Sequence, residues 1–133
     1  MTLSTPPIAR AIKVPGPDHP ITIERNAQQH VIVKIAGLIV ADTHHALTLK
    51  EANYPAVQYI PREDVDMSLL ERTDHNTYCP YKGECNYYSI KIGGERAKNA
   101  VWAYEHPYDA VALIKDHVAF YPDRVDTIEA IDR

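Results

Sequence analysis

The sequence predicts a mainly β fold: a compact, curled antiparallel sheet or small barrel-like domain with two short helices. Apolar residues alternate with polar ones over many short stretches, which is the period of a half-buried strand. Only two segments show helical spacing, and the connections are too short for the crossover helices of a parallel sheet. A chain of 133 residues fits one domain with one main core.

The chain divides into an extended arm at residues 1–20 and a single β-rich domain at residues 21–133. The arm is predicted from its prolines, which are Pro6, Pro7, Pro15, Pro17 and Pro20. Alternation then predicts the first strands of the domain. They are Ile21–Arg25, Val31–Ile35, Leu38–Ala41, Leu47–Lys50 and Val57–Ile60.

The segment after Pro61 changes from strand to helix spacing. Proline suits the first turn of a helix, and the acidic residues that follow favour the positive end of its dipole. Val65, Leu69 and Leu70 give an apolar face, so Arg62–Arg72 is expected to be helical. Asp74–Glu84 has no periodicity and contains turn-forming residues, which predicts a loop.

The last third of the chain returns to short strands around one further helix. Two strands, Tyr88–Ile92 and Ala100–Tyr104, are expected on either side of a Gly93–Gly94 turn. The second helix is expected to begin at Pro107 and to carry Tyr108, Val111 and Ile114 on one side. Val118–Tyr121 and Val125–Ile128 are the final predicted strands.

Charge and composition argue against several functional classes. The net charge of −4 comes without a basic stripe, which disfavours binding to a nucleic acid duplex. No apolar run approaches the roughly 18 residues of a membrane span. The first ten residues lack the pattern of an export signal, so a cytoplasmic location is expected, with Cys79 and Cys85 as thiols.

Tyrosine is unusually common, with nine residues against one Phe and one Trp. A core needs only the apolar ring, so repeated tyrosine suggests hydroxyls that reach water, a ligand or a partner chain. The alternative is a small domain whose core lies close to its surface everywhere.

The segment Thr77–Gly83 is the strongest candidate for a functional surface. Pro80 and Gly83 restrict and turn the backbone, which suits a rigid loop that presents side chains. Lys82 is expected to reach solvent or an anion, because no apolar period requires it to pack. Cys79 is interpreted either as a nucleophile or as a small buried apolar residue.

Zinc and magnesium chemistry are weaker interpretations. Cys79 and Cys85 are farther apart than the usual zinc knuckle, even with His75, His44 or His45 as further ligands. Glu63, Asp64 and Asp66 could hold Mg²⁺, but the start of a helix already explains them. No metal site is therefore predicted, and the cofactor stays open.

Several motifs resemble the uncharacterised bacterial family called domain of unknown function 427, also labelled nucleotidyltransferase family nine. They are Tyr59-Ile60-Pro61-Arg62-Glu63-Asp64-Val65, Thr77-Tyr78-Cys79-Pro80-Tyr81-Lys82-Gly83, Tyr87-Tyr88, Ala100-Val101-Trp102-Ala103-Tyr104 and Val118-Ala119-Phe120-Tyr121. The resemblance covers about residues 21–126 and implies a compact β-rich domain. The transferase label comes from the resemblance alone. Members similar to this chain often carry a small residue in place of Cys85.

These observations predict a Tyr-rich pocket for a small anionic ligand, bounded by residues 59–64 and 77–82. The candidate ligand-binding residues are Tyr59, Arg62, Thr77, Tyr81, Lys82, Tyr87, Trp102 and Tyr104. The candidate catalytic residues are Asp64 and Cys79. The competing hypothesis is a non-catalytic interaction module whose Tyr-rich surface binds protein, including a second copy of the chain as a homodimer.

Overall fold

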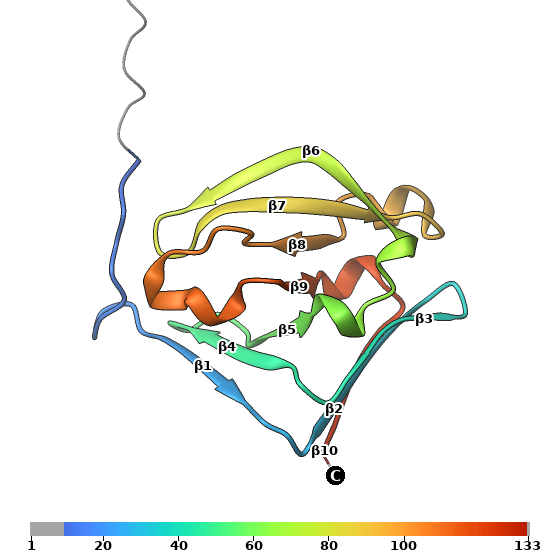
Figure 1. The fold of residues 1–133 in the computed structure, drawn as a ribbon, viewed down its shortest axis with the longest axis horizontal. Coiled ribbons are helices and arrows are strands. Elements are labelled where there is room, and N and C mark those ends of the chain that lie inside the picture. The colour runs from blue at the N-terminus through green and yellow to red at the C-terminus, as the bar shows by residue number, and fades with distance from the viewer. Residues whose placement is uncertain (1–9, 133) are drawn as a thin grey trace, which may run out of the picture.

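Two antiparallel β-sheets make up the computed structural model, which describes residues 10–132 (Figure 1). The larger sheet has the order β1-β4-β5-β9-β8-β7-β6, and the smaller sheet has the order β10-β2-β3. The strands are β1 (Ile21–Arg25), β2 (Gln29–Ile35), β3 (Leu38–Thr43), β4 (Leu47–Glu51), β5 (Val57–Pro61), β6 (Leu70–Cys79), β7 (Gly83–Ile90), β8 (Val101–Ala103), β9 (His117–Phe120) and β10 (Thr127–Asp132). The mainly β, antiparallel prediction is confirmed, and the seven-stranded sheet is open rather than closed into a barrel.

The larger sheet buries both of its faces. Neighbouring residues of a strand point to opposite faces, and β7 shows this with Tyr87 and Tyr88. Tyr88 contributes to the core between the two sheets, together with Val33 of β2. Tyr87 contributes to a second apolar cluster on the opposite face. Side chains that are adjacent in sequence are therefore separated by the thickness of the sheet.

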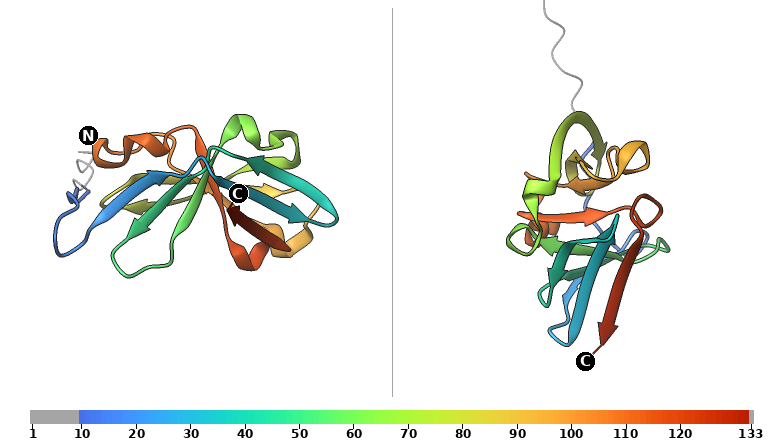
Figure 2. Two further views of the ribbon diagram at one scale, coloured as in Figure 1. Left: turned by 90° about the horizontal axis from the view of Figure 1, so that it is seen from below. Right: turned by 90° about the vertical axis from the view of Figure 1, so that its right-hand side faces the viewer.

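The smaller sheet is centred on β2, whose side chains Val31, Val33 and Ile35 are almost completely buried. β3 pairs with one edge of β2 and β10 with the other, so that Ile128 lies opposite Val33. This sheet lies toward one side of the molecule, and β1 and β4 extend away from it (Figure 2). The core between the sheets is thus completed by strands from opposite ends of the chain.

The predicted helix at Arg62–Arg72 and the predicted loop at Asp74–Glu84 are both wrong. Two 3-10 turns, η1 (Arg62–Asp64) and η2 (Met67–Leu69), lead directly into β6. Val65 forms an isolated β-bridge with Ala41 instead of a helical turn. β6 is an edge strand with mostly exposed side chains, so its residues show no alternation even though they pair with β7.

The second predicted helix is also only a 3-10 turn. It is η4 (Asp109–Ile114), which is kinked at Val111, where φ is −126° and ψ is 28°. Val111 and Ile114 are fully buried in the apolar cluster that contains Tyr87, so the expected apolar face is present. The remaining turns are η3 (Gly94–Ala97) and η5 (Pro122–Arg124).

The expected extended arm is described from Arg10 onward, and Pro6 and Pro7 lie outside the described residues. The arm runs along the β6–β7 hairpin. The Lys13 amide donates to the Pro80 carbonyl at 2.9 Å, and the Tyr78 hydroxyl donates to the Ala11 carbonyl at 2.7 Å. Over residues 10–132, no helix has the length and apolar character needed to cross a membrane.

Candidate functional site

The turn between β6 and β7 directs Lys82 into the molecule. The Lys82 amide donates to the Cys79 carbonyl at 3.2 Å, and Pro80 occupies the second position of this turn. Gly83 follows with φ +108°, a conformation that L side chains rarely adopt. A Cβ at Gly83 would also lie 3.3 Å from the His106 carbonyl oxygen. These three features define the path of a tight turn.

Lys82 forms a buried ion pair with Glu51, so its ammonium meets an anionic group of the chain itself and not solvent. The two residues are 9% and 8% exposed. The Lys82 Nζ donates to Glu51 Oε1 and lies 5.6 Å from the centroid of the Tyr104 ring. His19 Nε2 lies 2.7 Å from the other carboxylate oxygen of Glu51. The pair joins β4, near one edge of the large sheet, to the hairpin at the other edge.

The pKa of Glu51 reflects two opposing effects. Burial alone raises the pKa of this carboxyl, because the charged form loses its hydration. Hydrogen bonds from Lys82 and His19, and then their charges, outweigh burial, so the net pKa lies below its ordinary value. Glu51 is therefore a carboxylate at neutral pH, and it neutralises the ammonium beside it.

Sequence reasoning missed Glu51, although a signal was present. Leu47, Leu49 and Glu51 alternate along β4, and all three are buried. A carboxylate at the third position of a buried alternation needs a partner with the opposite charge. Lys82 supplies that charge from 31 residues further along the chain.

An aromatic cavity of about 200 Å³, called here the ring cavity, has both residues of this ion pair in its lining. It is lined by five of the predicted ligand-binding residues, which are Tyr59, Lys82, Tyr87, Trp102 and Tyr104. It is also lined by Leu49, Glu51, Tyr54, Pro55, Val57, Cys85 and Tyr121. Trp102 Nε1 donates to the Tyr59 hydroxyl at 3.1 Å, and the Trp102 and Tyr121 rings are 4.4 Å apart.

Burial keeps three phenols and one thiol around the ring cavity protonated. It raises the pKa values of Tyr59, Tyr87 and Tyr104 well above that of an exposed phenol. It also raises the pKa of the Cys85 thiol, although neighbouring hydroxyls partly oppose this. Neutral phenols can donate hydrogen bonds to a ligand, whereas a neutral, buried thiol is a poor nucleophile.

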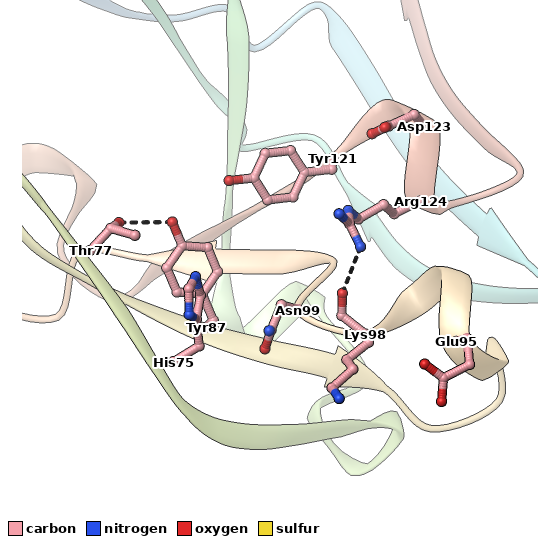
Figure 3. Close-up of a pocket in the computed structure, with 9 residues that line it drawn as sticks. All are labelled: His75, Thr77, Tyr87, Glu95, Lys98, Asn99, Tyr121, Asp123 and Arg124. Atoms are coloured by element: carbon pink, nitrogen blue, oxygen red, sulfur yellow. Dashed lines mark hydrogen bonds between the residues drawn. The ribbon is translucent and has the colours of Figure 1, made fainter.

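A second cavity of about 530 Å³, called here the polar cavity, shares Tyr87 and Tyr121 with the ring cavity (Figure 3). Its other lining residues are His75, Thr77, Glu95, Lys98, Asn99, Asp123 and Arg124. The Thr77 and Tyr87 hydroxyls are 2.8 Å apart on one side. On the other side, Arg124 Nη1 donates to the Lys98 carbonyl at 2.9 Å, and its guanidinium lies 5.9 Å from the Tyr121 ring centroid.

Arg62 and Asp64 do not join the other predicted residues. Arg62 donates to the Tyr88 hydroxyl at 2.8 Å, and Tyr88 lies on the face of β7 opposite Tyr87. Asp64 accepts a hydrogen bond from Thr43 at 2.7 Å, on the surface between β3 and η1. The sheet therefore separates both residues from the ring cavity.

Cys79 and Tyr81 lie close to the ring cavity but do not line it. Cys79 packs partly buried against the apolar cluster of Tyr87. Tyr81 lies on the outside of the turn, where its ring stacks on His19 with a centroid distance of 4.0 Å. Within residues 10–132, no group of three or more His, Cys, Asp and Glu side chains is placed to hold a metal ion.

Comparison with known families gives one match. The family model described as "Domain of unknown function (DUF427)" matches residues 23–130, which are most of the chain. The matched segment contains every residue that lines the ring and polar cavities, from Leu49 to Arg124, and leaves out His19. No curated protein matches the chain.

Proposed function

We propose that this chain, which belongs to the DUF427 family, binds a small molecule that joins a planar ring to an anionic group. The description of the family assigns no activity, so the proposal is argued from the residues of the chain itself. The ring cavity would hold the ring, and the polar cavity would hold the anionic group. The proposal concerns binding only, because Asp64 and Cys79 line neither cavity.

The ring cavity has the lining that favours a planar ring. Its walls are phenol and indole side chains, which bind rings through edge-to-face and offset contacts. The two opposite charges in its lining cancel, because Lys82 is already paired with Glu51. A second full charge placed there would have no partner, so the part of the ligand in this cavity should be uncharged.

The polar cavity offers hydrogen-bond donors for an anion. Asn99 Oδ1 already accepts from the Thr73 hydroxyl at 2.7 Å, so the Asn99 amide group is left to donate. Arg124 uses Nη1 for the Lys98 carbonyl and keeps further N–H groups for a carboxylate or phosphate. The cavity also has a volume within the roughly 300–1,000 Å³ range of small-molecule sites.

The observation that carries the proposal is the pair of shared walls. Tyr87 and Tyr121 line both cavities, so the two cavities are neighbours, and the proposal places a single molecule across both. The Tyr121 ring centroid is 4.4 Å from that of Trp102 and 5.9 Å from the Arg124 guanidinium. A ring on one side of Tyr121 and an acid on the other would satisfy this arrangement.

Titration calorimetry with benzoate and phenyl phosphate tests the proposal, with phenol and inorganic phosphate as the separated parts. Both joined compounds should bind more tightly than either part. Arg124→Gln should weaken their binding about ten- to hundredfold, which is the value of one charge-assisted hydrogen bond. Arg25→Gln, on an exposed residue of β1, is the matched control and should bind like wild type.

Two results would reject the proposal. One is the absence of binding by all four compounds, and the other is equal affinity in Arg124→Gln and Arg25→Gln. The competing hypothesis of a Tyr-rich interaction surface has less support. All nine tyrosines lie within the described residues, and Tyr54 alone among them is exposed.

A further inference from the structure

The larger sheet has a local gap between β5 and β9. These strands pair only at Ile60 with Val118 and at Pro61 with His117. Toward its start, β5 pairs with β4 alone within residues 10–132. Trp102 of β8 lies at this gap, because it lines cavities on both faces of the sheet.

The cavity on the far face of the gap, called here the inter-sheet cavity, has a volume of about 530 Å³. Val33 and Ile128 of the small sheet form one wall, and Ile60 and Phe120 of the large sheet form the opposite wall. The two sheets flank it from opposite sides, and exposed residues, among them Tyr54 and Pro122, line its mouth. Val33, Ile60 and Phe120 are at most 4% exposed.

The charged side chain that lines the inter-sheet cavity, Glu51, already has partners. Glu51, at its edge, is bound by Lys82 and His19. The Gln58 side-chain oxygen accepts a hydrogen bond from Thr48 at 3.0 Å. A charged molecule would therefore lose its hydration there without gaining an opposite charge. An apolar molecule has no such favourable hydration to lose.

We propose that the inter-sheet cavity is a second binding site, and that it takes a small, uncharged hydrophobic molecule. Apolar cavities of about 150 Å³ in other proteins stay empty of water and bind benzene. The inter-sheet cavity is more than three times larger, so it can hold a substituted ring or a short hydrocarbon chain. This site goes beyond the proposed function. Five of its lining residues also line the ring cavity, but Val33, Ile60, Phe120 and Ile128, which form its apolar walls, do not.

Trp102 makes the proposal measurable, because it is the only tryptophan of the chain. Methylcyclohexane is a suitable probe, since it is uncharged, apolar and does not absorb where tryptophan does. Titration should change the Trp102 fluorescence and raise the melting temperature with saturation. Ile128→Phe, which fills the cavity from its wall, should weaken this binding about tenfold or more.

Ile131→Phe is the matched control, because Ile131 lies on the same strand, is 48% exposed and does not line the cavity. It should bind the probe like wild type. Nuclear Overhauser contacts from the probe to Phe120 and Val33 in the wild-type protein test the same site without relying on a variant. Such contacts would support the proposal even if Ile128→Phe did not fold.

Three outcomes would overturn the inference: no response to the probe up to its solubility, equal binding by Ile128→Phe and Ile131→Phe, or a dimer that covers the cavity mouth and excludes the probe. The result is independent of the ring-and-anion proposal. Arg124→Gln should leave methylcyclohexane binding unchanged, and Ile128→Phe should leave benzoate binding unchanged. Failure of one proposal can therefore be distinguished from failure of the other.

Discussion

Replacing Lys82 by Met tests the role of the buried ion pair in stability. The Lys82 and Glu51 side chains are each 11% exposed, so the substitution leaves a carboxylate in a poorly hydrated site with only His19 beside it. Removing one partner of a buried pair costs about 3–5 kcal/mol in the free energy of unfolding. Lys50→Met is the matched control, because Lys50 is the exposed neighbour of Glu51 on the opposite face of β4.

The expected shift in melting temperature follows from the chain length. An unfolding entropy of about 2.1 cal/mol/K per residue gives about 0.28 kcal/mol/K for 133 residues. A loss of about 3–5 kcal/mol therefore lowers the melting temperature by about 11–18 °C. Lys50→Met should change the free energy of unfolding by no more than about 0.5 kcal/mol, or about 2 °C.

Calorimetry and urea unfolding of both variants give the result directly, and the double variant Lys82→Met/Glu51→Leu completes the cycle. The double variant should recover most of the loss, because apolar groups can replace a buried pair at little cost. If Lys82→Met melts together with Lys50→Met, or if the double variant is as unstable as the single one, the reasoning is refuted.

The pH dependence of the same pair has a defined sign. The folded-state pKa of Glu51 lies below the ordinary value of 4.5, so the carboxylate contributes stability that is fully present above about pH 4.5. That contribution is lost as the pH falls toward the lowered pKa. The stability difference between wild type and Glu51→Gln should therefore narrow below about pH 4.5 in acid unfolding curves. A difference that stays constant down to acid unfolding would contradict this.

Two further predictions concern the thiols and a close backbone approach. An alkylating reagent should modify Cys79, which is partly buried, before Cys85, which is buried and whose thiol pKa is raised by that burial. Peptide mapping of the native protein gives the two rates, and equal rates would argue against the burial of Cys85. Gly93→Ala should strongly reduce the melting temperature, because its Cβ would overlap the Ala97 side chain, whereas Gly16→Ala meets no atom within 4 Å and should be nearly neutral.

The parts of the fold that the sequence predicted are those in which one face of a strand is buried. In β2, the alternation of Val31, Val33 and Ile35 follows directly from a small sheet packed on one side. β6 could not be recognised, because an edge strand with both faces largely exposed has no such alternation. The spacing of Val65 and Leu69 fits a helix. The segment is extended instead, because Val65 forms a β-bridge with Ala41 and β6 begins at Leu70.

The candidate site was predicted in its aromatic part and not in its charged part. Tyr59, Tyr87 and Trp102 converge because each alternates toward the same face of the large sheet, which sequence periodicity can indicate. Arg62 was misplaced because motif proximity says nothing about which face a side chain takes after a turn. The partner of Lys82 depends on how far the sheet curls, and curvature is a property of long-range pairing that local pattern does not contain.

The pairing of β10 with β2 has a consequence for synthesis of the chain. β2 leaves the ribosome early, but its second neighbour, residues 127–132, is made about 95 residues later. At roughly 5–20 residues per second, this leaves one edge of the apolar segment Val31–Ile35 unpaired for about 5–20 s. An unpaired apolar edge is a template for association with other chains. Truncations before Thr127 should therefore aggregate, and chaperones that bind extended apolar segments should act on this strand first.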